Sequence, residues 1–297
     1  MSSIALPFSN LSKSETAALG YLSRYPNKQT FSIYSRYINE WFKWCDENGI
    51  DPIEATRLHM DLYVRLNIEK GYSPATINAM FCPVKGMYKL AYSDRLIDRD
   101  PASVVKLPSV PEPILTPFDR DDMRLFLKTA KSTGSRHFAL SMLLGVLGLR
   151  VSEACGLDVE QTRNMENGVP ILRFNGKGDK PAAIPLPYQV TNAINLVTEG
   201  RSSGPLLLTR DGSSRLTRSA ARGLLETVSG RTGMDRVVNP HLLRKAAITI
   251  VINEAGLEAG QRFARHSDPK TTLRSYFLNK DDAFNHPSHL VAAKLSF

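Results

Sequence analysis

The sequence predicts a mainly helical protein with one small β-sheet, an α+β fold in two domains. Apolar residues recur at helical spacing along most of the chain. Residues 170–187, PILRFNGKGDKPAAIPLP, instead place two apolar segments around a glycine-rich turn, which is the pattern of a β-hairpin. Helical spacing also stops at 107–117, LPSVPEPILTP, where four prolines indicate an extended connection between domains.

Composition excludes several classes of protein. The chain has 297 residues, 42% hydrophobic and 23% charged, which excludes a disordered tail and a collagen-like fibre. The longest apolar run, 138–146, is too short to cross a membrane, and no charged-then-apolar signal segment opens the chain. Three widely spaced cysteines, Cys45, Cys82 and Cys155, suggest neither a disulfide framework nor a zinc site. We therefore expect a protein of the reducing cytoplasm with no membrane partner.

Positive charge is concentrated in the second part of the chain. The formal net charge is +9: residues 1–112 carry 13 Lys and Arg against 12 Asp and Glu, and residues 113–297 carry 25 against 17. A basic surface favours polyanions such as nucleic acid or anionic lipid, because phosphate contacts release condensed counterions. An ordinary solvated basic surface is the alternative that composition leaves open.

The first domain is expected at 1–107, as a helical bundle. Residues 1–12 are small and polar, which predicts a loose terminus. Gly49 and Gly71 end helical patterns, and Ser73-Pro74 begins one. The predicted helices span 30–48, 54–69 and 74–92, with a short fourth at 96–105. Residues 108–117 form the linker.

The second domain is expected at 118–297. It contains the hairpin, a buried helix at 135–147 and an apolar tail at 289–297. Residues 116–122 are expected to cap its first helix. The remaining helices are predicted at 119–132, 188–199, 216–230, 240–255, 257–265 and 270–278.

The heptapeptide at 239–245, NPHLLRK, combines features of a phosphate site. Proline at the first helical position fixes the helix start, and His241 and Arg244 then share one face of the first turn. An imidazole, a guanidinium and free backbone N–H groups thereby surround one point. Taken alone, the heptapeptide also fits a surface His–Arg pair on an amphipathic helix.

Two further cations stand in unusual surroundings. Arg150 directly follows the buried helix, where a guanidinium needs an anionic partner, and Glu153 three residues later is the candidate. Lys177 stands at the hairpin tip between two glycines, from which a long side chain can enter a cleft. Ordinary turn chemistry is the alternative for Lys177.

The last candidate residues lie near the C-terminus, in FARHSDPKTTLRSY. A helix is expected to end at His266, and a new helix after the turn carries Tyr276. Taken alone, this tyrosine fits a core position on an amphipathic helix better than a catalytic role.

Taken together, these residues make the chain resemble the tyrosine recombinase (phage integrase) family. The motifs GLRVSE, GKGDK, PHLLRK and RHSDPKTT followed by a tyrosine occur in that family's order, and the resemblance extends from about residue 11 to the C-terminus. It implies that 1–107 is a core-DNA-binding domain. It also implies a compact phage integrase or Xer-type resolvase without an N-terminal arm-binding domain, since the bundle begins near residue 11.

The resemblance also implies a role for each candidate residue. Arg150 and Arg244 match the arginines that clamp the scissile phosphate, and Tyr276 matches the nucleophile. The other matching positions are Lys177 at the hairpin, His241, His266, and Glu153 as support for Arg150. Lys177 is the candidate acid for the leaving oxygen, with Lys180 as a weaker alternative, and His241 is the candidate base. Lys180 and Lys245 are further candidates for DNA contacts.

The sequence departs from the family pattern in two places. Ten residues separate His266 from Tyr276, where the compared members have nine, and one extra residue rotates a helical side chain by about 100°. Arg265 also stands where many members have glycine.

We expect neither a cofactor nor a metal. A phosphotyrosine intermediate conserves the phosphodiester energy, and the sequence lacks the clustered Asp and Glu of two-metal nucleases. The resemblance implies double-stranded DNA with short inverted-repeat core sites as substrate, a monomer when free and a homo-tetramer on DNA, and an accessory directionality factor. The tail containing Leu290, Val291, Leu295 and Phe297 suits docking into a neighbouring protomer, or else onto its own domain.

Three other functions remain as alternatives. One is a DNA-binding protein of the same fold that no longer cuts. The second is DNA relaxation of the type IB topoisomerase kind, which shares the phosphotyrosine chemistry. The third is a metal-dependent nuclease.

Overall fold

The computed structural model of the chain describes residues 11–111, 118–176 and 180–265. The chain divides into two compact units, 1–114 and 115–297. The division falls inside the stretch predicted as a linker. The predicted helix at 270–278 and the tail at 289–297 lie outside the described residues.

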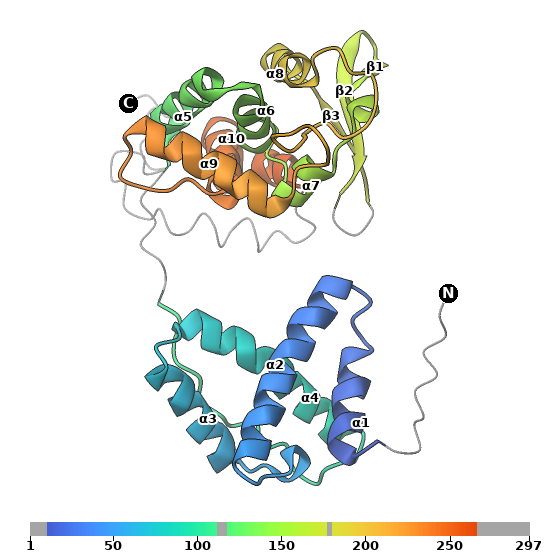
Figure 1. Cartoon of the computed structure of the whole chain (residues 1–297), viewed down its shortest axis with the longest axis vertical. Helices are drawn as coiled ribbons and strands as arrows, with labels where there is room; N and C mark the ends of the chain where they lie inside the picture. The colour runs from blue at the N-terminus through green and yellow to red at the C-terminus, as the bar shows by residue number, and fades with distance from the viewer. Residues whose placement is uncertain (1–10, 112–117, 177–179, 266–297) are drawn as a thin grey trace, which may run out of the picture. The chain divides into compact units, whose positions relative to one another are not determined.

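The first unit is a bundle of α-helices (Figure 1). Asn27 and Ser73 cap two of the predicted helices through side-chain bonds to backbone amides, and Pro74 begins the second of them. Its core is aromatic: the Trp41 indole donates to the Tyr88 hydroxyl at 3.0 Å, and both side chains are buried. The helices are α1 (Lys13–Leu22), α2 (Lys28–Glu47), α3 (Arg57–Glu69) and α4 (Pro74–Ser93), with a 3₁₀ turn at Pro52–Glu54.

Helix α1 was not predicted. It begins with a capping box, in which the Ser12 hydroxyl accepts from the Glu15 amide at 3.1 Å and Glu15 accepts from the Ser12 amide at 2.8 Å. The helix packs on α4, where Gly86 leaves space for the ring of Tyr21. The spacing of serine and glutamate was the sequence signal for this helix.

The predicted short helix at 96–105 is wrong, because this stretch consists of turns and bends. Arg95 has left-handed backbone angles, with φ 57°. Pro101 disfavours helical angles at Asp100, whose carboxylate instead accepts from the amide of Ala102 at 2.9 Å. The apolar residues of the stretch still reach the core, with Ala102 and Val105 buried.

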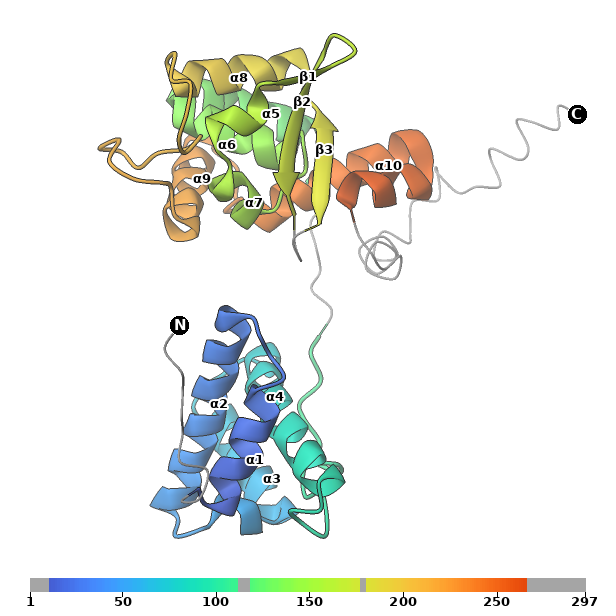
Figure 2. The same cartoon turned by 90° about the vertical axis from the view of Figure 1, so that its right-hand side faces the viewer.

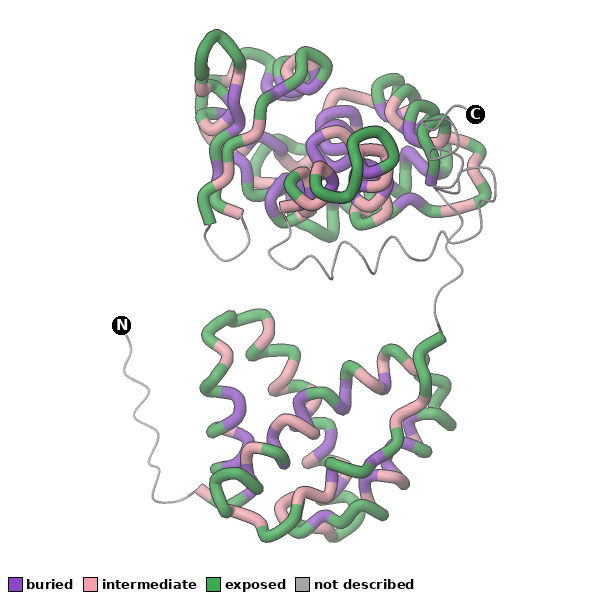
Figure 3. The backbone as a smooth tube through the Cα atoms, turned by 180° about the vertical axis from the view of Figure 1, so that it is seen from behind, coloured by how far each residue is buried: buried purple, intermediate pink, exposed green. Residues whose placement is uncertain are grey.

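The second unit is organised around α6 (Ser135–Gly145), the helix predicted to be buried. Residues 138–145 are all buried, because α6 packs against helices on several sides (Figure 1). Figure 3 shows the buried segments running through the interior. The surrounding helices are α5 (Arg120–Thr133), α7 (Val151–Gly156), α8 (Tyr188–Thr198), α9 (Arg218–Thr232) and α10 (Pro240–Ala264), with a 3₁₀ turn at Val159–Thr162. Within the predicted cap at 116–122, Asp119 is the capping residue of α5.

The predicted hairpin is confirmed and forms part of a three-stranded antiparallel sheet (Figure 2). Strand β2 (Val169–Asn175) pairs with β3 (Pro181–Pro185) and on its other side with β1 (Asn164–Glu166), which was not predicted. Leu172 lies opposite Ile184 and Asn175 opposite Pro181. Leu172 and Phe174 are buried against the helices. The observed fold class is therefore the predicted one, mainly helical with a small sheet.

Helix α10 breaks at Gly256, which has φ 84°. This break confirms the two predicted helices at 240–255 and 257–265. The second half approaches the first closely, since a Cβ at Gly260 would lie 2.0 Å from the side chain of Ile252. The break at Gly256 therefore determines where the end of α10, at Ala264, lies.

Candidate active site

Arg150 stands at the N-cap of the six-residue helix α7, in contact with Glu153. Its backbone amide donates to Glu153 Oε2 at 2.8 Å, and its guanidinium donates to Oε1 at 2.9 Å. The Glu153 side chain is only 4% exposed, whereas that of Arg150 is 30% exposed. The carboxylate is thus the buried support, and the guanidinium keeps an accessible side that can face an anion.

Arg244, on the second turn of α10, is buried at 4% exposure. Its two terminal nitrogens donate to the backbone carbonyls of Gly148 and Ala264. These carbonyls lie two residues before Arg150 and one residue before Arg265. Arg244 therefore ties together the two chain segments that carry the other guanidiniums of the site.

Gly148 is required by the geometry at this point. Its φ is 60°, in the left-handed region that favours glycine, and a Cβ would lie 2.6 Å from Cε1 of Phe263. The turn at Gly148 therefore brings the end of α6 against the last turn of α10 and presents a carbonyl to Arg244.

Glu153 has a second arginine partner, Arg265, which donates from Nη2 to Oε2 at 2.8 Å. Burial by itself raises the pKa of Glu153. The hydrogen bonds from Arg150 and the charges of Arg265 and Arg150 outweigh that effect and lower the pKa below its ordinary value of 4.5. Glu153 is thus a carboxylate at neutral pH and balances part of the positive charge.

The cations around Glu153 also affect one another. Burial and the charges of Arg150 and Arg265 lower the pKa of Arg244 to about 10, so the group remains protonated at pH 7. Partial burial and then the charges of Arg244 and Lys245 lower the pKa of His241 below 6.5. A neutral imidazole beside guanidiniums can accept a proton, while the guanidiniums attract an anion.

The start of α10 agrees with the sequence prediction. Pro240 is its first residue, and the Asn239 side chain accepts from the amide of Leu242 at 2.9 Å. His241 lies in this first turn, one turn before Arg244, and is partly exposed. Burial lowers the pKa of the neighbouring Lys245.

The turn end of the hairpin lies beside the same cluster. The Gly176 amide donates to the Lys180 carbonyl at 2.8 Å, and a Cβ at Gly176 would lie 3.5 Å from Glu153 Oε1. The Lys180 side chain is exposed. Lys177, His266 and Tyr276 lie outside the described residues, so their roles stay predictions.

A pocket of about 560 Å³ opens between α7 and the hairpin strands. Ser152 and Glu153 line it from α7, and Arg173, Phe174 and Asn175 line it from β2. Glu153 therefore both contacts the arginines and lines this pocket.

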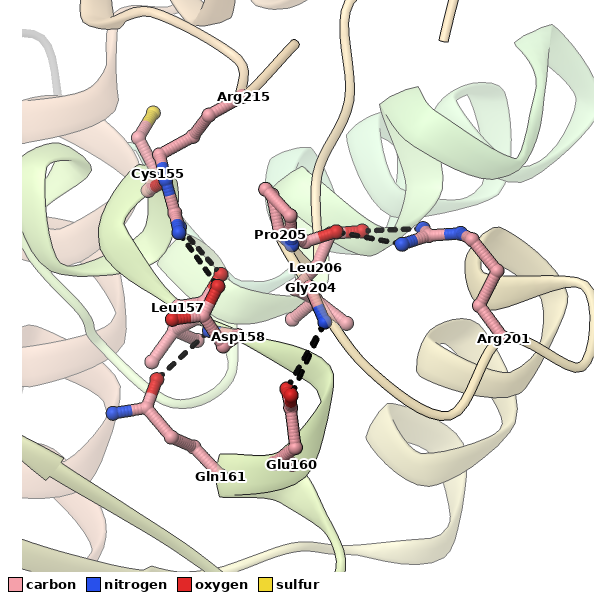
Figure 4. Close-up of polar contacts among 10 residues, drawn as sticks. All are labelled: Cys155, Leu157, Asp158, Glu160, Gln161, Arg201, Gly204, Pro205, Leu206 and Arg215. Atoms are coloured by element: carbon pink, nitrogen blue, oxygen red, sulfur yellow. Dashed lines mark hydrogen bonds and ion pairs between the residues drawn. The ribbon is translucent and has the colours of Figure 1, made fainter. Parts of the chain in front are cut away.

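The far end of α7 is held by Arg215, in the loop before α9 (Figure 4). The Arg215 guanidinium donates to the carbonyls of Cys155 at 3.3 Å and Leu157 at 2.8 Å, and to the Asp158 carboxylate at 2.5 Å. A helix this short has few internal bonds, so donors from outside the helix are needed for the carbonyls at its end, and Arg215 supplies two of these contacts. Arg215 thereby fixes the helix that carries Arg150 and Glu153.

The loop after α8 is tied to the same region. Glu160 accepts from the Gly204 amide at 3.2 Å, and Arg201 donates to the carbonyls of Pro205 at 2.7 Å and Leu206 at 3.2 Å (Figure 4). The Leu206 amide donates to the Leu157 carbonyl at 2.9 Å. These side-chain and backbone hydrogen bonds connect the end of α7 to the loop that follows α8.

Sequence reasoning did not assign the roles of Arg215 and Arg265. Arg265 was noted only as an unusual residue, and its partner Glu153 is 112 residues away. Arg215 and Cys155 are 60 residues apart. An arginine at a helix end where glycine is common was the only local signal for Arg265.

The second unit is thus a mainly helical domain with a small sheet whose clustered guanidiniums are suited to bind an anion. A family model described as the phage integrase family matches residues 117–282, more than half of the chain. The chain belongs to this family.

Curated relatives cover most of the chain. It is 26% identical over 242 residues to tyrosine recombinase XerD of Pseudomonas putida, which covers 77% of this chain and 80% of the relative. It is 27% identical to tyrosine recombinase XerA of Thermococcus kodakarensis, covering 82% of each. It is 26% identical to tyrosine recombinase XerC of Bacillus pumilus, covering 85% and 87%.

Solved structures share the fold. A lambda integrase tetramer bound to a Holliday junction gives a TM-score of 0.73 at 12% identity, covering 91% of this chain and 78% of that one. An integrase of the transposon Tn1549, in complex with transposon right end DNA, gives 0.72 at 21% identity, covering 97% and 100%. Among the helices that the structure describes, none is both long and apolar enough to cross a membrane.

Proposed function

We propose that this chain is a site-specific DNA recombinase, an integrase that cuts and rejoins DNA strands through a 3′-phosphotyrosine intermediate. The observation that carries the proposal is the arrangement of Arg150 and Arg244. The two guanidiniums come from elements 94 positions apart in the chain, yet both are fixed around the turn at Gly148. Family membership and relatives named tyrosine recombinases support the same conclusion.

The guanidiniums serve as a phosphate clamp. A planar guanidinium bonds two phosphate oxygens at once and stays charged at neutral pH, which suits it to the negative charge of a pentavalent phosphorane. Arg150 offers its accessible side, and Glu153 holds it in orientation. By analogy with oxyanion donors, removal of either arginine should slow cleavage roughly 10²–10³-fold.

Cleavage is a transesterification. The Tyr276 oxygen bonds to phosphorus as the bond from phosphorus to the 5′-oxygen breaks. The tyrosine proton passes to His241, and the leaving 5′-oxygen takes a proton from Lys177, with Lys180 as the weaker candidate. His266 donates to a non-bridging oxygen. The lowered pKa of His241 supports its role as base, and the position of Gly176 against Glu153 supports the role of the hairpin.

Rejoining reverses these steps. The 5′-hydroxyl of a second strand attacks the phosphotyrosine, forms a new phosphodiester and releases the tyrosine. The bond energy is kept throughout, so the reaction consumes no nucleotide cofactor. Guanidinium and imidazole donors supply the electrostatic stabilisation that metal ions supply in two-metal nucleases.

The substrate is double-stranded DNA in the cytoplasm, and the protein acts on it as an oligomer. Exchange of two duplexes requires four active sites, so we propose a homo-tetramer on short inverted-repeat core sites, formed from free monomers. The solved lambda integrase tetramer on a Holliday junction supports this assembly. The first unit binds the duplex as a core-DNA-binding domain. We place the boundary between the two domains at the stretch 108–117.

A strand-exchange assay tests the proposal. Duplexes recovered by selection from a random library with the purified protein would be labelled with two different dyes and incubated together in EDTA. Recombinant products carrying both dyes are expected. Relaxation of a supercoiled plasmid without exchange would instead establish a topoisomerase-like activity. Binding without cleavage would establish an inactive DNA-binding protein.

A further inference from the structure

Arg265 ends α10 in a conformation that an arginine adopts at a cost. Its φ is 52° and its ψ is 43°, in the left-handed region, and its amide donates to the carbonyl of Arg262 at 3.1 Å. Glycine closes a helix in this way without strain. An arginine held here needs a compensating contribution from its side chain.

The compensating contacts come from α7 and β2. Arg265 Nη2 donates to Glu153 Oε2 at 2.8 Å, and the guanidinium carbon lies 5.1 Å from the centre of the Phe174 ring. The Arg265 side chain is only 20% exposed. Its Nε and Nη1 have no hydrogen-bond partner within the described ranges, so its polar contact depends on Glu153.

The last turn of α10 is therefore held at two consecutive residues. The carbonyl of Ala264 accepts from Arg244, and the side chain of Arg265 donates to Glu153. Glu153 in turn receives the amide and the guanidinium of Arg150. One carboxylate thus joins the arginine at the start of α7 to the arginine at the end of α10.

We propose that Arg265 is a positioning residue that fixes the end of α10 against α7 and β2, acting through Glu153 and Phe174. The chain leads from Arg265 to the proposed nucleophile Tyr276 in eleven residues. The consequence of this contact for catalysis therefore rests on the proposed recombinase function. The contact also sets how Glu153 divides its oxygens between two guanidiniums, and thereby the orientation of Arg150.

The first test needs no DNA. Amide hydrogen exchange would be measured across 257–265 in full-length wild type, Arg265→Gln and Arg262→Gln. Arg262 is an exposed arginine in the same last turn, so its substitution removes one charge nearby without touching Glu153. Arg265→Gln is expected to speed exchange about 10-fold and Arg262→Gln to leave it unchanged. Equal exchange in all three proteins would overturn the proposal.

The second test separates positioning from binding. Covalent adduct formation would be followed on a nicked duplex recovered by selection with wild type, alongside the Kd for that duplex. Arg265→Gln is expected to slow adduct formation about 10-fold while Kd changes less than about twofold. In a Glu153→Gln background, Arg265→Gln should slow adduct formation by a smaller factor than it does in wild type, because only the contact with Phe174 is left to lose. A defect confined to Kd, or full multiplicative losses in the double variant, would overturn the proposal. Absence of any wild-type adduct would refute the recombinase function and leave the exchange test decisive for the contact.

Discussion

The carboxylate of Glu153 accepts two hydrogen bonds from Arg150, one from the backbone amide at 2.8 Å and one from the guanidinium at 2.9 Å. The first bond caps α7 and the second orients the side chain. Local helix geometry and the orientation of a site residue thus depend on a single buried group. Glu153 connects the folding of the second unit to its chemistry.

Replacing this carboxylate should destabilise the protein. Glu153→Gln leaves one oxygen for donors from both Arg150 and Arg265, so we expect a loss of about 1–3 kcal/mol in the free energy of unfolding. Urea denaturation measures it. Glu226→Gln is the matched control, since Glu226 pairs with Arg222 on the exposed face of α9 and should cost less than about 0.5 kcal/mol. Equal effects from the two substitutions would contradict the role of Glu153.

The difference in the free energy of unfolding between wild type and Glu153→Gln should depend on pH. The pKa of Glu153 is lowered in the folded state from 4.5. Its contribution is therefore present at pH values above 4.5 and is lost as the pH falls through the folded-state pKa. The gap in urea midpoint between wild type and Glu153→Gln should be constant from pH 7 to 5 and shrink on further acidification. A gap that widens in acid would show that the sign is wrong.

Arg215 should stabilise α7 from its other end. Arg215→Ala removes the donor to two carbonyls and to Asp158, so we expect a loss of about 1–2 kcal/mol and faster amide exchange at 151–157. Arg222→Ala removes an arginine from an exposed pair on α9 and serves as the control. Unchanged exchange at α7 in Arg215→Ala would show that Arg215 does not hold the helix.

Gly148 should tolerate no side chain. Gly148→Ala adds left-handed strain and a contact 2.6 Å from Phe263, so we expect about 2–4 kcal/mol of destabilisation. Gly168→Ala, at φ 79° in open space, isolates the backbone strain and should cost about 1 kcal/mol. Thermal denaturation compares the two. Similar losses in the two variants would mean that the clash with Phe263 does not contribute to the destabilisation by Gly148→Ala.

The pH dependence of cleavage should report His241. Burial and the neighbouring charges of Arg244 and Lys245 lower its pKa below 6.5. If the neutral imidazole is the base, the rate of adduct formation should fall only at a pH below 6.5, about tenfold for each further unit. His241→Gln should react more slowly and lose this acid limb. An identical acid limb in the variant would assign it to another group.

Features encoded locally were predictable from the sequence. The hairpin follows from alternating residues around a glycine-rich turn, and the break in α10 follows from Gly256. Helix α7 was not predicted because six residues are too few for a periodic pattern. A helix was wrongly predicted at 96–105 because the apolar spacing is helical there, although Pro101 disfavours helical backbone angles at the residue before it.

The site shows the same limit. The sequence pointed to Arg150, Glu153, His241 and Arg244 as candidates because each stands in a short motif. The contacts of Arg215 and Arg265 were not, because their partners are 57 to 60 and 112 residues distant. Such contacts depend on how the elements pack, which spacing along one sequence does not encode.

Covalent attachment to DNA tests the central claim most directly. A nicked duplex carrying the selected site traps the intermediate, because the short fragment that leaves with the 5′-hydroxyl diffuses away. Wild type in EDTA should give a protein–DNA band that survives denaturing electrophoresis, and Tyr276→Phe should give none. A wild-type protein that forms no band, or a band that persists in Tyr276→Phe, would contradict the account.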